Sequence, residues 1–307
     1  MARPPREVRV VAEAIERVAQ GPEFGRFEIV SSLTRFARRN PVGAIAGLLC
    51  GAFVALAVVG PYLAPHSADL TTFPRLEAPS WEYPLGTDNL FRDMFSRILV
   101  GTRNSIGIGF VSVAISTSIG LLLGLTSGYI GGWLDMAVGR LVDVCLSFPY
   151  LVFLIFFLTI FQPSYLTVSI AIGINMLPAV VRVVRSATIG VRHQQYIEAA
   201  LLLGASNARI MFRHILPNIT APIIVIASLQ IGYAILVEAS LSFLGLGVST
   251  AQNPSWGRML QETRLYWQVA WWTALVPGAT ISLAVLSFNL FGDALRDALD
   301  PRLRGTR

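Results

Sequence analysis

Six stretches of this sequence are apolar over about 20 residues each, which is the length that a helix needs to cross a lipid bilayer. They are Val42–Ala64, Asn104–Ile130, Leu141–Phe161, Ser164–Val181, Ile219–Val237 and Trp271–Gly292. Only 14% of the 307 residues are charged, whereas soluble domains carry about 25%. So few charges cannot cover a soluble surface. The sequence therefore predicts an all-α, multi-pass membrane protein with six transmembrane helices.

Arginine is distributed unevenly between the segments that join these spans, and the chain contains no lysine. With a cytoplasmic N-terminus, the inner segments hold 18 arginines and the outer segments hold 6. Cytoplasmic loops of membrane proteins carry the excess of basic residues. Both termini are therefore expected in the cytoplasm, and the net charge of +6 calls for no nucleic-acid partner. This topology predicts a cytoplasmic extension (1–40), a first span with an external loop (41–103) and a core (104–307).

Several residues inside the spans predict local features. Glycine and serine recur in the second span, including Gly120 and Gly124, and small residues allow two helices to approach closely. Pro149 is expected to kink the third span. Four tryptophans near an outer boundary are typical of an interfacial aromatic belt. They are Trp256, Trp267, Trp271 and Trp272.

The thiol and imidazole side chains do not form a recognisable site. Cys50 and Cys145 both lie within apolar stretches, where a free cysteine behaves as a small hydrophobic residue. His66, His193 and His214 have no spacing typical of metal ligands. The sequence therefore predicts neither a disulfide framework nor a metal site.

The cytoplasmic loop between the fourth and fifth spans (192–217) has the most informative sequence. It predicts two short helices that are joined near Gly204, because glycine readily adopts the positive φ that ends a helix. Ser206 or Asn207 is placed to cap the second helix. Pro217 suits the first turn of the fifth span, where no amide donor is required.

This loop also carries apolar residues that do not suit a bare cytoplasmic surface. They are Ile210, Met211, Phe212, Ile215 and Leu216. Ala199 and Ala200 would let another surface approach the backbone closely. These features predict a docking element for a soluble partner, but the composition equally permits an amphipathic helix at the membrane surface.

The same loop resembles the coupling loop of permease subunits in bacterial ABC importers, which reads Glu-Ala-Ala, three residues, Gly, nine residues, Ile-x-Leu-Pro. The matching residues are Glu198, Ala199, Ala200, Gly204, Leu216 and Pro217. His214 stands at the family's isoleucine position, and Ile215 follows one place later. That departure occurs in the peptide-importer branch.

Three further segments resemble the smaller of the two permease subunits in dipeptide and oligopeptide importers. They are residues 85–105, 238–257 and 288–303. Phe91 stands where that family usually has glycine, which leaves the backbone turn at this position open. The resemblance covers residues 35–307.

The resemblance implies the fold of a type I ABC importer permease in the bacterial inner membrane. It further implies that a second, homologous permease completes the pathway, that two cytoplasmic subunits bind ATP and Mg, and that an external binding protein delivers di- or oligopeptides. The chain has no Gly-x-x-x-x-Gly-Lys-[Ser/Thr] phosphate loop, so it is expected to be no enzyme and to hold no cofactor. The residues expected at the ATPase contact are Glu198, Ala199, Ala200, Gly204, Arg209, Phe212, Leu216 and Pro217.

Two groups of polar residues at the outer side each allow two interpretations. Glu238, together with Ser242, either lines the pathway at an outer gate or holds the outer loop. The other group consists of Asp88, Arg92, Asp93 and Arg97. Their alternating charges either meet the binding protein or, as we favour, form a self-contained cluster of salt bridges and caps.

Competing functions make different demands on the spans. An ion-coupled secondary transporter requires ionisable residues at mid-membrane, and the spans contain almost none away from their ends. An intramembrane enzyme requires a catalytic pair at depth, and no span contains a histidine or a pair of aspartates. Within the permease family the cargo stays open, because nickel chelates and glutathione are carried by the same branch.

Overall fold

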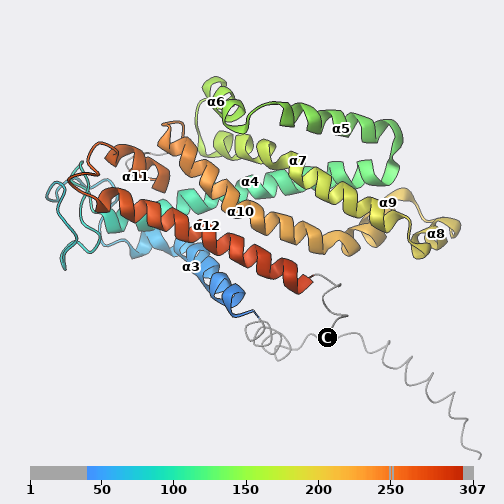
Figure 1. Cartoon of the computed structure of the whole chain (residues 1–307), viewed down its shortest axis with the longest axis horizontal. Helices are drawn as coiled ribbons and strands as arrows, with labels where there is room; N and C mark the ends of the chain where they lie inside the picture. The colour runs from blue at the N-terminus through green and yellow to red at the C-terminus, as the bar shows by residue number, and fades with distance from the viewer. Residues whose placement is uncertain (1–39, 249, 251, 300–307) are drawn as a thin grey trace, which may run out of the picture. The chain divides into compact units, whose positions relative to one another are not determined.

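The computed structural model describes residues 40–248, 250 and 252–299, and this part of the chain is built from helices joined by loops (Figure 1). The helices are α3 (Pro41–Leu63), α4 (Met94–Ile130), α5 (Gly132–Ser147), α6 (Tyr150–Ile160), α7 (Tyr165–Arg192), α8 (Gln195–Leu202), α9 (Asn207–Arg209), a π-helical turn η1 (Ile210–Ile215), a 3₁₀ turn η2 (Leu216–Ile219), α10 (Thr220–Phe243), α11 (Trp256–Thr263) and α12 (Trp272–Leu299). The predicted extension 1–40 lies almost wholly outside the described residues.

Five helical segments in the described part are long and apolar enough to cross a membrane, and the bent pair α5–α6 supplies a sixth candidate. The five are α3, α4, α7, α12 and the continuous segment Asn207–Phe243. The all-α architecture with six spans is thereby confirmed, with one span broken. We use "inner end" for the end that carries α8, which the arginine distribution places in the cytoplasm, and "outer end" for the end that carries α11 (Figure 1).

The third predicted span is broken and not merely kinked. The axes of α5 and α6 differ by 91°. Phe148, directly before Pro149, has an extended backbone (φ −99°, ψ 136°), which is the conformation that a following proline favours. An extended residue interrupts the helix completely, so the single kinked helix over Leu141–Phe161 was wrong. The residues between the second and third predicted spans are likewise helical from Gly132 onward.

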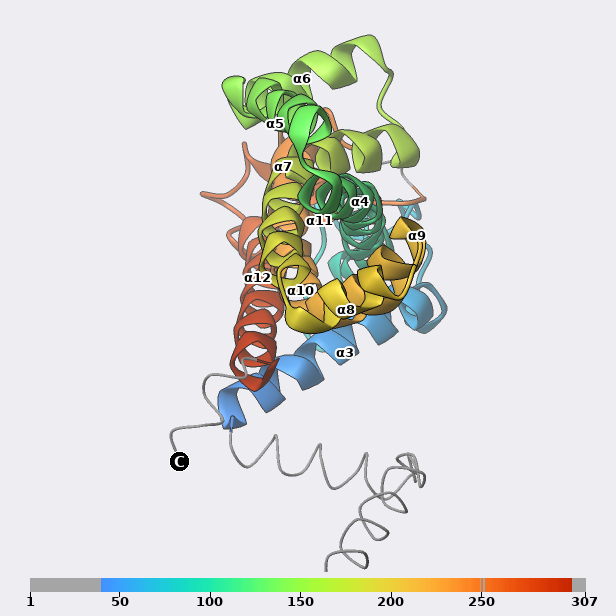
Figure 2. The ribbon, with the colours of Figure 1, turned by 90° about the vertical axis from the view of Figure 1, so that its right-hand side faces the viewer.

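Helices α4 and α7 pack closely through glycines on α4. A Cβ atom on Gly124 would lie 2.8 Å from the Val184 Cβ, and one on Gly128 would lie 2.9 Å from the Arg185 carbonyl oxygen. These distances are too short for a side chain larger than hydrogen. The predicted close approach of the second span to a neighbouring helix is confirmed. Seen from the inner end (Figure 2), α4, α7 and α10 lie between the α5–α6 pair and the α3–α12 pair.

Two of the four belt tryptophans are interior residues. Trp256 and Trp272 are almost fully buried, and their indole nitrogens donate to the carbonyl oxygens of Ile98 and Thr87, each at 3.2 Å. They fasten the loops of the outer end to the helices, so their assignment to the belt was wrong. Trp267 and Trp271 remain exposed, at 58% and 57%.

Helix α4 starts ten residues before the predicted second span. Asp93 caps it, since its carboxylate accepts from the backbone nitrogens of Phe95 (3.3 Å) and Ser96 (2.9 Å). Residues 94–103, predicted as external loop, are therefore the first turns of α4.

Candidate functional site

The predicted coupling loop forms a bent helical segment at the inner end, here called the elbow (195–219). Helix α8 ends at Leu202, and Gly204 then takes a positive φ of 79°, as predicted. The second helix is not separate, because α9, η1, η2 and α10 follow one another without a break over Asn207–Phe243. The second helix was predicted to be short and to precede the fifth span, and this was wrong. The elbow therefore joins a transmembrane helix directly.

Local hydrogen bonds determine the shape of the elbow. Ser206 caps the second helix by accepting from the Arg209 backbone nitrogen (3.4 Å), whereas Asn207 instead accepts from the Tyr129 hydroxyl on α4 (3.0 Å). Pro217 lies in the first turn of η2 and has no amide proton to donate to a carbonyl oxygen of the preceding turn η1. The widened π-helical turn directly precedes this proline.

One side of the elbow is buried against the chain's own helices. Ile197, Ile210 and Ile215 are each 0% exposed and pack in one cluster with Leu125 of α4 and Val184 of α7. The sequence predicted Ile210 and Ile215 as part of an apolar docking face, and this was wrong. Their burial instead locks the elbow onto α4 and α7, so that a movement of the elbow moves these helices too.

The other side of the elbow exposes leucines that sequence reasoning treated only as spacers. Leu202 and Leu203 are 90% and 89% exposed, and Leu201 is 47% exposed. We call residues 201–203 the leucine ridge. Three consecutive leucines at the end of a short helix cannot all face one core, which was the signal available in the sequence. Such exposed apolar groups are typical of a docking surface.

The predicted ATPase-contact residues all lie in the elbow. Six of them are exposed, namely Glu198, Ala199, Gly204, Arg209, Phe212 and Pro217. Ala200 and Leu216 are half-buried. Among the described residues none forms a hydrogen bond or ion pair with the Glu198 carboxylate, which leaves this group open to a partner.

Glu238 and Ser242 are interior residues near the outer end of α10. Both are 0% exposed, and the Ser242 hydroxyl donates to Glu238 Oε1 at 2.6 Å. The backbone of neighbouring Ala239 lies so close to α11 that a Cβ on Gly257 would be 2.3 Å from its carbonyl oxygen. This position favours holding the outer loop over lining a pathway.

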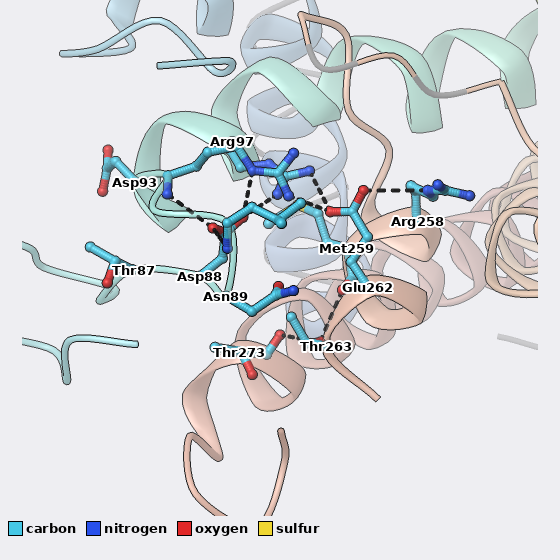
Figure 3. A network of polar contacts seen from close by, with 12 residues as sticks. Thr87, Asp88, Asn89, Asp93, Arg97, Arg258, Met259, Glu262, Thr263 and Thr273 are labelled. Carbon is cyan, nitrogen blue, oxygen red and sulfur yellow. Dashed lines mark hydrogen bonds and ion pairs between the residues drawn. The ribbon is translucent and has the colours of Figure 1, made fainter. Parts of the chain in front are cut away.

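The charged residues just before and at the start of α4 form a buried network with α11 (Figure 3). Arg92 contacts Asp88 at 2.7 Å and Glu262 at 2.6 Å, while Arg97 contacts Glu262 at 3.0 Å and also pairs with Asp88. Burial by itself would raise the pKa of Glu262, but the charges of Arg97 and Arg92 outweigh it and lower the pKa. The salt bridges and the cap that the sequence favoured are present, but the cluster is not self-contained, because Glu262 of α11 belongs to it.

Phe91 has the backbone conformation that glycine would have at this position. Its φ is +61°, in the left-handed region. The turn that the sequence left open is therefore retained with a phenylalanine. No group of three or more His, Cys, Asp or Glu side chains suitable for a metal ion occurs within the described residues.

Comparison with known proteins identifies the family. Residues 120–305 match the family described as "Binding-protein-dependent transport system inner membrane component". The chain is a member of this family. A binding-protein-dependent permease is a membrane component of a transporter and not an enzyme. With its several apolar helices, this permease is a multi-pass protein of the inner membrane.

Individual relatives of this permease are named for peptide and glutathione transport. It is 43% identical over 268 residues to the dipeptide transport system permease protein DppC of Alkalihalophilus pseudofirmus, covering 87% of this chain and 88% of that protein. It is also 43% identical over 272 residues to the glutathione transport system permease protein GsiD of Pectobacterium atrosepticum, covering 88% and 90%.

A solved structure supports the fold of this permease. A chain of the MetNI methionine ABC transporter, in inward-facing conformations, aligns with a TM-score of 0.54 at 17% identity. The alignment covers 66% of this chain and 96% of the MetNI chain. The fold is that of a type I ABC importer permease, as predicted.

Proposed function

We propose that this permease belongs to an ABC importer of di- or oligopeptides and couples transport to ATP hydrolysis in partner subunits through the elbow. The leucine ridge is the observation that carries this proposal, since it offers apolar surface at the inner end beside the exposed Glu198 side chain. The relatives named for dipeptide transport support the cargo class.

The ridge suits the energetic demand of coupling. Shifting a two-state transporter from 1:99 to 99:1 requires about 5.5 kcal/mol of differential binding. Burying one exposed leucine side chain contributes about 1.5–3 kcal/mol, whereas an exposed ion pair contributes at most about 1 kcal/mol. Two leucines that are nearly fully exposed are therefore the main contributors, and Glu198 sets the orientation through charge-assisted hydrogen bonds.

The elbow is also suited to pass a movement on to the spans. Its buried isoleucines, Ile197, Ile210 and Ile215, fasten it to α4 and α7, and its second half is continuous with α10. When two cytoplasmic ATPases close on ATP, the elbow follows, and the three helices change their tilt together. In this proposal ATP and Mg bind only to the partners, and a second, homologous permease completes the pathway.

Purification of the complex tests the docking role. The double variant Leu202→Asp with Leu203→Asp is expected to weaken ATPase binding roughly 100-fold or more, because two apolar contacts are lost and charges are buried. Leu265→Asp is the matched control, since Leu265 is 78% exposed in the loop after α11. Unchanged co-purification of the ATPase subunits with the double variant would contradict the proposal.

The outer end offers a contact for the external binding protein. Trp81 is fully exposed at the tip of a turn that is held by the hydrogen bond from the Ser80 nitrogen to the Tyr83 carbonyl oxygen (2.9 Å). A large aromatic side chain on an ordered turn is typical of an interface anchor. We expect Trp81→Ala to weaken stimulation of the ATPase by the cargo-loaded binding protein while leaving basal ATPase activity unchanged.

Glutathione is the second candidate cargo, because a relative of the same identity is named for glutathione transport. Glutathione and the dipeptides share peptide amides, so the two candidates are closely related in chemistry. Measuring which of dialanine and glutathione stimulates the ATPase of the complex with its cognate binding protein decides between them.

A further inference from the structure

The middle of α7 and α10 carries polar side chains on an otherwise apolar surface. The Tyr233 hydroxyl donates to Asn175 Oδ1 at 3.2 Å, and the Tyr233 side chain is exposed. An amide that faces lipid costs several kcal/mol, so polar groups at this depth normally face protein or a water-filled space. These two residues therefore do not suit a surface that faces lipid.

The polar pair lies in a groove of about 330 Å³ between α7 and α10. The groove is lined by Asn175, Met176, Ala179, Ile226, Leu229, Gln230 and Tyr233. Mostly apolar walls with a few polar groups are characteristic of ligand sites, which begin at about 300 Å³. No charged residue lines this groove.

A second cavity continues the groove toward the inner end. It has a volume of about 480 Å³ and shares Ile226 and Leu229 with the first. Asn218 of η2 and Ala221, Pro222 and Val225 of α10 also line it, and they follow one helix face at intervals of three and four residues. The hollow face thus runs from mid-membrane down α10 to the elbow.

Gln230 makes the wall of the groove rigid. Its amide nitrogen donates to the Met176 carbonyl oxygen (3.2 Å), and its amide oxygen accepts from the Ser116 hydroxyl (3.2 Å). Both ends of this side chain are used to tie α4, α7 and α10 together. By contrast, within the described residues the Asn175 amide nitrogen donates to no partner, which leaves hydrogen-bond donors available to a ligand.

We propose that this groove is a water-filled binding site for the amide backbone of a peptide in transit, with Asn175 and Tyr233 as its hydrogen-bonding residues. The inference rests on the proposed function. Because the upper groove holds neutral groups only, it recognises the amides that all peptides share and discriminates little between side chains. Neutral hydrogen bonds hold the cargo weakly enough to release it toward the inner cavity.

Thiol labelling in the assembled complex tests whether the groove contains water. With Cys50→Ala and Cys145→Ala as background, Asn175→Cys and Tyr233→Cys are compared with Ile224→Cys. Ile224 is a matched control, since it lies on α10, is 48% exposed and lines neither cavity. Maleimides react with the thiolate, which forms only in water. We expect a water-soluble maleimide to label positions 175 and 233 many-fold faster than position 224.

Peptide protection tests the cargo. Excess dialanine, trialanine or glutathione is expected to slow labelling at position 175 several-fold and to leave Ile224→Cys unaffected. In transport assays, Asn175→Leu and Tyr233→Phe are each expected to raise the KM of uptake about three- to tenfold through the loss of one hydrogen bond, without changing co-purification of the ATPases.

Each outcome of these labelling experiments either supports or contradicts the proposed binding site. Labelling at positions 175 and 233 as slow as at 224 overturns the water-filled groove and indicates contact with lipid or with the second permease. Fast labelling that none of the three peptides slows overturns the binding site. Neither result bears on the elbow, which is tested separately by ATPase binding, so a failure here is distinguishable from a failure of the proposed function.

Discussion

At the scale of single residues, Phe91 and Glu262 make opposite contributions to the stability of the outer end. Phe91 holds a left-handed backbone conformation that disfavours any residue with a Cβ atom. Glu262 is mostly buried, yet it pairs with three arginines, of which Arg97 and Arg92 favour its charged form most. The first residue costs stability and the second contributes it.

Replacing Phe91 by glycine and by alanine separates backbone strain from side-chain contacts. Both substitutions remove the ring, but only glycine relieves the positive φ. We expect Phe91→Gly to be more stable than Phe91→Ala by about 1 kcal/mol, seen as a higher Tm of the purified complex. Equal melting temperatures would contradict the strain.

The charge of Glu262 makes the stability of the outer cluster depend on pH. Its pKa lies below the ordinary value of about 4.3, so its charged form stabilises the fold. That contribution is complete above the ordinary pKa and is lost as the pH falls through the lowered one. Glu262→Gln is expected to cost about 2 kcal/mol at neutral pH, and the difference from wild type should vanish in acid unfolding measurements.

At the scale of helices, glycine determines both a bend and a close packing. Gly204 bends the elbow. A Cβ atom at this position would have nothing within 4 Å, so glycine is required here only because of the positive φ. Gly124 lies in a helix of ordinary conformation, and glycine is required there because a side chain has no room. The two glycines therefore respond differently to substitution.

Substitution at Gly204 tests the bend. Asparagine tolerates positive φ, so Gly204→Asn should retain much of the uptake. In Gly204→Val the positive φ costs about 1–2 kcal/mol of conformational free energy, so this variant should lose most of the uptake. Gly190→Ala is the control, because Gly190 has open space and no positive φ. Normal uptake by Gly204→Val at normal expression would contradict the role of the bend.

Substitution at Gly124 tests the packing of α4 on α7. A methyl group here would lie 2.8 Å from the Val184 Cβ, so Gly124→Ala is expected to destabilise the protein by about 1–3 kcal/mol. Gly51→Ala on α3 has nothing within 4 Å and should leave the Tm unchanged or raise it. Thermal unfolding of the two variants in one detergent makes the comparison.

At the scale of the whole molecule, one helical segment connects the inner surface with the groove. Asn207–Phe243 carries part of the elbow at one end and Glu238 near the other, and its hollow face lies between them. A movement of the elbow is therefore expected to change the shape of the groove. In the proposed function, partner subunits supply the force for this movement.

Reconstitution of this chain alone tests whether transport requires the partner subunits. In liposomes without a second permease and ATPases, we expect no uptake of dialanine or glutathione, with or without an ion gradient. The complete complex in the same liposomes is the positive control. Gradient-driven uptake by the chain alone would instead indicate an ion-coupled secondary transporter.

The sequence by itself determined the number of spans, the place of the interruption at Pro149 and the bend at Gly204. Each of these depends on local chemistry, namely on apolar length, on the extended conformation that proline favours in the preceding residue or on tolerance of positive φ. Neighbours distant in the sequence hardly alter such properties.

Only the tertiary structure decided which side of each helix faces the interior. In a membrane protein the lipid-facing and the core-facing residues are both apolar, so periodicity carries little information about orientation. Apolar residues in the cytoplasmic elbow pose a similar problem, because they can face either a partner or the chain's own helices. Ile210 and Ile215 were therefore mistaken for docking residues, and Trp256 was placed at the lipid interface although it lies in the interior. The contacts of each side chain depend on helices far away in the sequence, and those contacts exist only once the bundle has assembled.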